Sequence, residues 1–263
     1  MRSLAIAAAA IAVVGCSRGD PEPSPAGSPT ELLARAQERL REQATLTFES
    51  TYTRTRADRP DDPERYAEGE GALDLAARWG RLTFELDVDL PTSESQPDPL
   101  ADPITLRWDR SSLEAELGER RSRVDRAEAR DDGALLGALP DELEGLIGLL
   151  DDGRDERRLD DDEIDDYEVA HVAFTVEARA AGRAGVPAEL RKAFEQALYG
   201  PELALDAWID GGGLPRRLGY TVELEPVRRE GKLILPARTV EVVYDLAAFG
   251  EPVSGLEFES QAG

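Results

Sequence analysis

The stretch Leu82-Thr83-Phe84-Glu85-Leu86-Asp87-Val88-Asp89-Leu90 alternates apolar and polar side chains without a miss. Because successive side chains of a β-strand point to opposite faces, this alternation predicts a strand with one apolar and one charged face. The same period of two recurs at residues 45–53, 168–180, 205–210, 218–224 and 240–246, with shorter candidate strands at 69–77, 104–109 and 113–117. Together these segments predict an antiparallel sheet that buries only one of its faces.

Turn signals separate these strands. The segment 58–63 contains two prolines and is expected to end the first strand. Gly211-Gly212-Gly213 predicts a tight hairpin, because glycine adopts positive φ without steric cost. A last short strand is expected from Leu256 to Phe258.

Three segments have helical periodicity or residues that typically start and end a helix. Residues 30–43 form an amphipathic pattern behind Thr30 as the expected N-cap. Residues 187–199 begin with a proline and are followed by Gly-Pro. The leucine-rich segment 133–150 is interrupted by glycines and by Pro140, which is expected to restart a helix.

The predicted helices are too few to cover the predicted sheet. About nine strands at a spacing of about 4.8 Å make a sheet roughly 43 Å wide. Three helices, each about 10 Å wide, cover about 30 Å of it. The remaining apolar surface can curl on itself, pair with another chain or hold an apolar ligand. We expect an α+β fold: a single large curved antiparallel β-sheet, a half-barrel of about 9–11 strands, with several helices packed on its concave face.

Acidic residues dominate the charged surface. The chain has 55 Asp and Glu residues against 31 Lys and Arg residues, a formal net charge of -24, so its field repels nucleic-acid phosphates. The single Cys16 and the single His171 exclude an internal disulfide and a multi-histidine metal site. We therefore expect no nucleic-acid partner, no metal and no cofactor. Asp160-Asp161-Asp162-Glu163, within the acidic stretch 131–166, is expected to lie in a solvated loop in preference to a weak cation site.

The sequence favours a noncatalytic protein. It contains no Gly-x-Ser-x-Gly motif of the kind that carries the nucleophile of acyl hydrolases. His171 lies inside a predicted strand whose alternate residues are apolar, where a satisfied or solvent-facing histidine is expected more often than a catalytic base.

The amino terminus resembles that of bacterial lipoproteins. An apolar run of 11 residues from Leu4 to Val14 follows Arg2; it matches a signal-peptide core and is shorter than the roughly 20 residues that span a bilayer. Val13-Val14-Gly15-Cys16 is similar to the lipobox of bacterial lipoproteins. In that motif the cysteine sulfur receives a lipid, and the chain is cleaved directly before the cysteine. The resemblance implies a signal peptide over residues 1–15 and a lipid anchor on Cys16, at the extracytoplasmic face of the cell membrane.

Two further segments complete the expected organisation. Residues 16–29 include four prolines and no large apolar residue, so they are expected to form a flexible tether. Residues 30–263 are expected to form a single domain.

Three stretches of the second half resemble the LppX/LprG group of actinobacterial lipoproteins, which are similar in shape to the LolA and LolB carriers. They are Tyr167–Val176, with its histidine-containing strand, Asp206–Leu218, with its Trp-Ile-Asp core and glycine turn, and Tyr244–Val253, with its Phe-Gly-x-Pro-Val ending. The first half matches in layout. The resemblance implies a pocket between sheet and helices that binds multi-acylated lipids, so that a lipid or glycolipid is the expected ligand.

These observations predict a membrane-anchored lipoprotein that binds acylated lipid in an apolar cavity between sheet and helices and carries or presents it in the cell envelope. The alternative is an envelope interaction or sensing module that uses the same groove for a protein or peptide. The residues expected to line the cavity are two wall phenylalanines, one wall tyrosine and the apolar residues of a lid over 135–150: Phe84, Phe174, Tyr220, Leu135, Leu136, Leu139, Leu143, Leu146 and Ile147. The sequence does not identify a protein partner.

Overall fold

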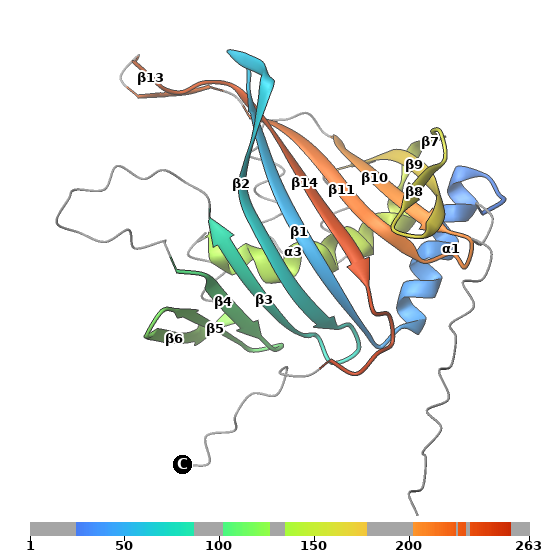
Figure 1. The fold of residues 1–263 in the computed structure, drawn as a ribbon, viewed down its shortest axis with the longest axis horizontal. Coiled ribbons are helices and arrows are strands. Elements are labelled where there is room, and N and C mark those ends of the chain that lie inside the picture. The colour runs from blue at the N-terminus through green and yellow to red at the C-terminus, as the bar shows by residue number, and fades with distance from the viewer. Residues whose placement is uncertain are drawn as a thin grey trace, which may run out of the picture.

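The computed structural model describes residues 25–86, 102–126, 135–177, 202–224, 226–229 and 232–253. Within these residues 12 strands form one large, open, curved antiparallel sheet, against which two α-helices lie (Figure 1). The strand order is β6-β5-β4-β3-β2-β1-β14-β11-β10-β9-β7, and β8 pairs with β9 beside this path. The expected fold class, α+β with a single curved antiparallel sheet, is confirmed.

The elements have the following bounds. The helices are α1 (Pro29–Glu42), α3 (Leu135–Leu149) and the short 3-10 helix η1 (Leu150–Asp152). The strands of the first half are β1 (Thr45–Arg56), β2 (Arg59–Asp74), β3 (Trp79–Leu86), β4 (Ile104–Trp108), β5 (Ser112–Leu117) and β6 (Arg120–Asp125). Those of the second half are β7 (Arg154–Arg158), β8 (Asp162–Ile164), β9 (Tyr167–Glu177), β10 (Glu202–Asp210), β11 (Pro215–Leu224), β12 (Val227–Arg229), β13 (Lys232–Leu235) and β14 (Arg238–Ala247).

The middle of the sheet joins the two halves of the chain. β1 pairs with β14 over ten residue pairs, from Thr47 opposite Ala247 to Arg56 opposite Arg238. β2 to β6 extend from one side of this pair, and β11, β10, β9 and β7 from the other. The sheet is therefore continuous across both halves of the chain.

The expected hairpin at the three glycines joins β10 to β11. Gly213 has a φ of +85°, as the turn requires. The buried Asp210 fixes the turn, because its carboxylate accepts hydrogen bonds from the Leu214 backbone N–H at 2.9 Å and from Arg216 Nε at 2.6 Å.

The N-cap of α1 is Ser28 and not Thr30. Ser28 Oγ accepts a hydrogen bond from the backbone N–H of Glu31 at 3.3 Å, and Glu31 Oε2 accepts one from the backbone N–H of Ser28 at 2.9 Å. This capping box satisfies two amides that the first turn leaves without partners, and Pro29 needs none. The expectation for Thr30 is wrong because it overlooked this serine–glutamate pair.

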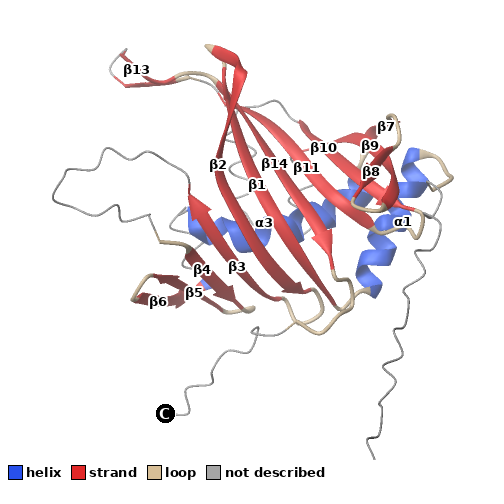
Figure 2. Cartoon of the chain, in the orientation of Figure 1, coloured by secondary structure: helices blue, strands red, loops and turns tan. Residues whose placement is uncertain are grey.

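Helix α3 runs without interruption through Pro140, Gly145 and Gly148. The expected restart at Pro140 is therefore wrong. Proline removes one backbone hydrogen bond from a helix, and the burial of Leu143, Leu146 and Leu149 against the sheet offsets that loss. Figure 2 shows α3 crossing behind the central strands, while α1 contacts α3 and lies at the end of the sheet near β7 and β10.

The first strand ends near 58–63 as expected, at Arg56, but the expected loop is wrong in extent. β2 begins at Arg59 and continues through Pro60 and Pro63, and the turn between β1 and β2 is only two residues long. β3 pairs only with Ala67–Asp74 of β2. The proline-containing part of β2 therefore lies at an edge of the sheet. Proline is tolerated there because no neighbouring strand on that side needs its backbone N–H.

Five strands were not expected from the sequence: β6, β7, β8, β12 and β13. β6 reads RRSRVD and is exposed on both faces, so it shows no alternation of polarity. β7 and β8 lie inside the acidic stretch 131–166, and Asp162 and Glu163 of the expected acidic loop belong to β8, where both are exposed. The expected helix at 187–199, the end of the quoted stretch at 87–90 and the strand Leu256–Phe258 lie outside the described residues.

Glycine makes room for a large ring on the inner face of the sheet. A Cβ on Gly80 would overlap the indole of Trp108 and would lie 2.8 Å from Leu73 Cδ2. Trp108 is 1% exposed and fills that space. The close approach of this ring to the backbone of β3 therefore requires glycine at position 80.

We expect Gly80→Ala to lower the free energy of unfolding by about 1–3 kcal/mol, because the added methyl group overpacks the core. Urea denaturation followed by circular dichroism measures this loss. Gly219→Ala is the matched control, since its Cβ would come no closer than 3.3 Å to any neighbour. An equal loss in both variants would contradict the account of Gly80.

Candidate functional site

One hydrophobic cluster fills the layer between the inner face of the sheet and the helices. α1 contributes Leu32, Leu33 and Leu40, and the strands contribute aromatic rings. Phe48 and Tyr244 meet edge to face with ring centroids 5.9 Å apart, and Tyr52 and Phe84 do so at 5.6 Å. Such pairs are favourable beyond the area they bury, so the centre of the inner face is an aromatic wall.

The residues expected to line the cavity divide into two groups. Six are buried members of the same hydrophobic cluster, so the structure brings them together: Phe84 of β3, Phe174 of β9, Tyr220 of β11, and Leu143, Leu146 and Ile147 of α3. Leu135, Leu136 and Leu139 belong to the first half of α3, but their side chains lie outside the described part of the molecule. That these nine residues line a ligand cavity stays a prediction.

A carboxyl group lies inside this apolar layer. Glu142 of α3 is 6% exposed, and its Oε1 accepts a hydrogen bond of 2.7 Å from the hydroxyl of Tyr220 on β11. The hydroxyls of Tyr244 and Tyr52, on β14 and β1, are 2.9 Å apart and hydrogen bonded. Because β11, β14 and β1 are neighbours in the sheet, we name these four residues the tyrosine–glutamate cluster.

Burial shifts the titration of the whole cluster. It raises the pKa of Glu142 above its ordinary value of 4.5, and hydrogen bonds from Tyr220 and Tyr244 offset part of that rise. It also raises the pKa values of Tyr52, Tyr220 and Tyr244 well above 10.0, with the neighbouring carboxyl adding to the effect. The three hydroxyls therefore keep their protons at neutral pH and act as hydrogen-bond donors.

Two further polar side chains are buried in the same layer. Gln37 of α1 is 2% exposed, and its Nε2 donates to the backbone carbonyls of Ile147 and Gly148 at 3.4 and 3.3 Å. This contact ties α1 to the end of α3. Gln37 Oε1 and the indole N–H of Trp108 find no hydrogen-bond partner in the described structure. An apolar interior with a few polar groups is typical of small-molecule binding sites.

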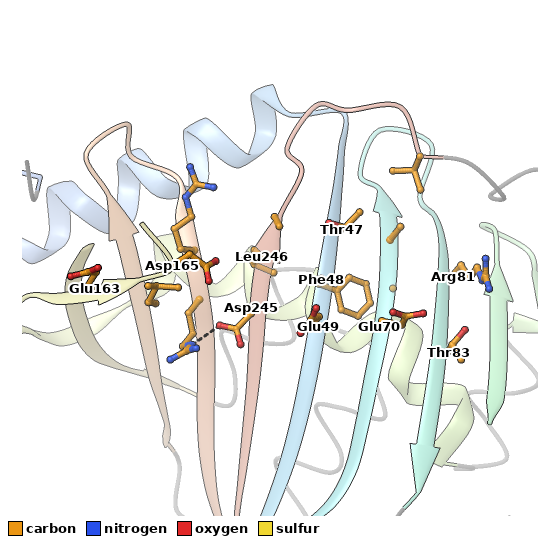
Figure 3. A pocket seen from close by; sticks show the side chains of 17 residues that line it. Thr47, Phe48, Glu49, Glu70, Arg81, Thr83, Glu163, Asp165, Asp245 and Leu246 are labelled. Carbon is orange, nitrogen blue, oxygen red and sulfur yellow. Dashed lines mark hydrogen bonds and ion pairs between the residues drawn. The ribbon is translucent and has the colours of Figure 1, made fainter. Parts of the chain in front are cut away.

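The opposite face of the sheet is polar. A groove of about 590 Å³ crosses it, with Thr47, Glu49, Glu70, Arg81 and Asp245 in its lining (Figure 3). A second hollow of about 300 Å³ shares Glu49 and Glu70 and adds two more glutamates of β2 and β3. Charged groups would lose hydration against an acyl chain, so these grooves do not suit an apolar ligand.

His171 also lies on this outer face. Its Nε2 is 2.7 Å from Asp206 Oδ1, and its ring stacks on the indole of Trp208 at 4.1 Å between centroids. The carboxylate and the indole hold the imidazole in place. This arrangement matches the satisfied histidine that was expected inside a strand.

Solved structures share this fold. LprF from Mycobacterium bovis aligns with a TM-score of 0.53 and 14% sequence identity, over 88% of this chain and 97% of that chain. The lipoprotein LppX from Mycobacterium tuberculosis aligns with a TM-score of 0.49 and 9% identity, over 86% and 96%. No family model and no curated protein matches the sequence. The protein therefore has the fold of LprF, and the resemblance to the LppX/LprG group is confirmed at the level of the fold.

Sequence reasoning missed most of the tyrosine–glutamate cluster. Tyr52, Tyr220 and Tyr244 occupy apolar positions of alternating strands, where tyrosine indicates only burial. Glu142 lies two residues after Pro140, where the sequence predicts only the start of a helix and gives no sign of burial. Only the pairing of β11, β14 and β1, with α3 across them, brings these groups together.

We expect the stability of the protein to fall as the pH rises through the elevated pKa of Glu142. The folded state binds this proton more tightly than the unfolded state, so the contribution is complete below 4.5 and is then lost at up to about 1.4 kcal/mol per pH unit. Urea titrations of the wild type and Glu142→Gln at increasing pH measure the difference. Exposed Glu85→Gln controls for the loss of one carboxylate. A constant difference between wild type and Glu142→Gln would contradict this assignment.

Proposed function

We propose that the protein is a noncatalytic, membrane-anchored lipoprotein that binds an acylated lipid between the sheet and the helices and carries or presents it in the cell envelope. One observation carries the proposal: the aromatic and aliphatic side chains gather on the single sheet face that the helices cover, whereas the opposite face and its grooves are charged. The fold shared with LprF supports it.

The lid of this site is α3, and its walls are the inner faces of β3, β9 and β11. Each CH2 group that moves from water into the layer contributes about 0.8 kcal/mol, which is enough to bind a long acyl chain. Three glycines in α3 each weaken the helix by about 0.5–1 kcal/mol relative to alanine. The lid can therefore yield to a ligand more readily than an alanine-containing helix would.

A lipid on Cys16 holds the protein at the membrane, and residues 16–29 give the domain its reach. Two or three acyl chains make such anchoring effectively permanent. None of the helices in the described part of the chain is long and apolar enough to cross a bilayer.

The position of the one histidine favours binding over catalysis. His171 is on the outer face, engaged by Asp206 and Trp208, and the apolar layer is on the other side of the sheet. A lipid held between sheet and helices would not contact it.

We expect protein purified from its own envelope to carry lipid in native mass spectrometry and to take up a fluorescent acyl probe. Leu146→Trp should weaken probe binding by about tenfold or more, because a larger side chain fills space at the buried face of α3. Val243→Trp, on the outer face of β14, is the matched control, and urea denaturation verifies that both variants fold. Absence of lipid together with absence of probe uptake would overturn the proposal, and capture of a peptide instead would favour the interaction module.

We expect wild-type protein to incorporate labelled palmitate and to partition into the detergent phase of Triton X-114. Cys16→Ser should abolish both, because serine lacks the thiol that carries the lipid. Ser17→Ala is the matched control. If the Cys16→Ser protein still incorporated labelled palmitate and still partitioned into the detergent phase, Cys16 would not be the site of the lipid anchor.

A further inference from the structure

The tyrosine–glutamate cluster joins a helix that covers the ligand site to the sheet beneath it. The carboxyl of Glu142 comes from α3, and the hydroxyls of Tyr52, Tyr220 and Tyr244 come from three adjacent strands. All four side chains are at most 9% exposed. Their hydrogen bonds are thus made in an apolar layer, where a polar group without a partner is strongly disfavoured.

Displacement of α3 by a ligand would break the bond between helix and sheet. Glu142 would leave with the helix, and the 2.7 Å hydrogen bond from the Tyr220 hydroxyl to Glu142 Oε1 would be lost. The hydroxyl pair of Tyr52 and Tyr244 would remain among Phe48, Phe84 and Leu246. A pure hydrocarbon cannot replace the hydrogen bond that Glu142 accepted, so a ligand that supplies an acceptor oxygen at this point binds better than one that does not.

We propose that the hydroxyls of Tyr220, Tyr244 and Tyr52 form a subsite for the carbonyl oxygen of an acyl lipid, and that Glu142 occupies this subsite while no lipid is bound. The inference rests on the proposed function and adds the chemical group that the interior recognises. Tyr220 and Tyr244 donate hydrogen bonds to the carbonyl oxygen, and the hydroxyl of Tyr52 keeps its hydrogen bond with that of Tyr244. A carbonyl oxygen has two lone pairs and can accept both bonds.

The environment favours a neutral oxygen over an anion. Burial disfavours a charged ligand group here as it disfavours the ionised form of Glu142, and among the described residues no cation offsets that effect on Glu142. Phosphate and ionised carboxylate are therefore poor ligands for the subsite. The carbonyl of an ester and that of a protonated fatty acid both fit, since they present the same acceptor.

A pair of lipids that differ in one carbonyl tests the subsite. 1-Palmitoylglycerol carries an ester where 1-O-hexadecylglycerol carries an ether, and both displace a fluorescent acyl probe from the full mature protein if they bind. We expect wild type to prefer the ester by about tenfold. The same displacement assay, with palmitic acid compared with hexadecanol at a pH below 4.5, tests whether the carbonyl of a protonated fatty acid also binds the subsite.

Variants assign the preference to the cluster. Tyr220→Phe and Tyr244→Phe should each reduce the ester-to-ether ratio to near one. Tyr167→Phe, which alters a tyrosine stacked under Arg216 outside the cluster, should keep the ratio. Glu142→Leu should raise ester affinity more than ether affinity, because it removes the internal competitor.

The outcomes separate the subsite from the function on which it rests. Equal binding of ester and ether by wild type would overturn the subsite and leave lipid binding intact, and this comparison requires no variant to fold. A preference that survives both tyrosine substitutions would overturn the assignment to these residues. Binding of neither lipid would overturn the proposed function and the subsite together.

Discussion

A sheet with one apolar face and one charged face is stable in water only when something covers the apolar face. Here that constraint determines the whole arrangement: the sheet curves, and α1 and α3 lie on its inner side. The hydrogen bond from Tyr220 to Glu142 and the contact of Gln37 with the end of α3 hold this cover at defined points. Buried leucines of both helices, including Leu33, Leu143 and Leu146, supply the apolar part of this cover.

The two faces also divide the charge of the molecule. On the outer face Asp245, Glu49 and Glu70 lie directly opposite one another across three neighbouring strands. Such like-charge pairs are unfavourable, and Asp245 is compensated by Arg217 at 2.6 Å. The arrangement keeps that face hydrated, whereas the inner face is left for apolar contacts. The net charge of -24 is thus compatible with an apolar interior.

Alternation of polarity predicted the strands that have one face in the core, including β1, β3, β9, β10, β11 and β14. It failed where a strand has no buried face: β6 is exposed throughout, and the outer part of β2 is a ribbon that continues through two prolines. Six of the nine residues expected to line the cavity are buried in one cluster, because burial is what the alternating pattern reports. Glu142 could not be predicted, since its environment is created by strands that are distant in sequence.

The pairing of β1 with β14 has a consequence for how the molecule is made. Phe48 lies opposite Leu246, so the central ladder joins segments that are far apart along the chain. Topologies dominated by such non-local contacts fold slowly. During synthesis, amino terminus first, the middle of this sheet cannot be completed until β14 has emerged. Closure of the sheet is therefore a late event in folding, and an incomplete chain leaves β1 without its β14 partner.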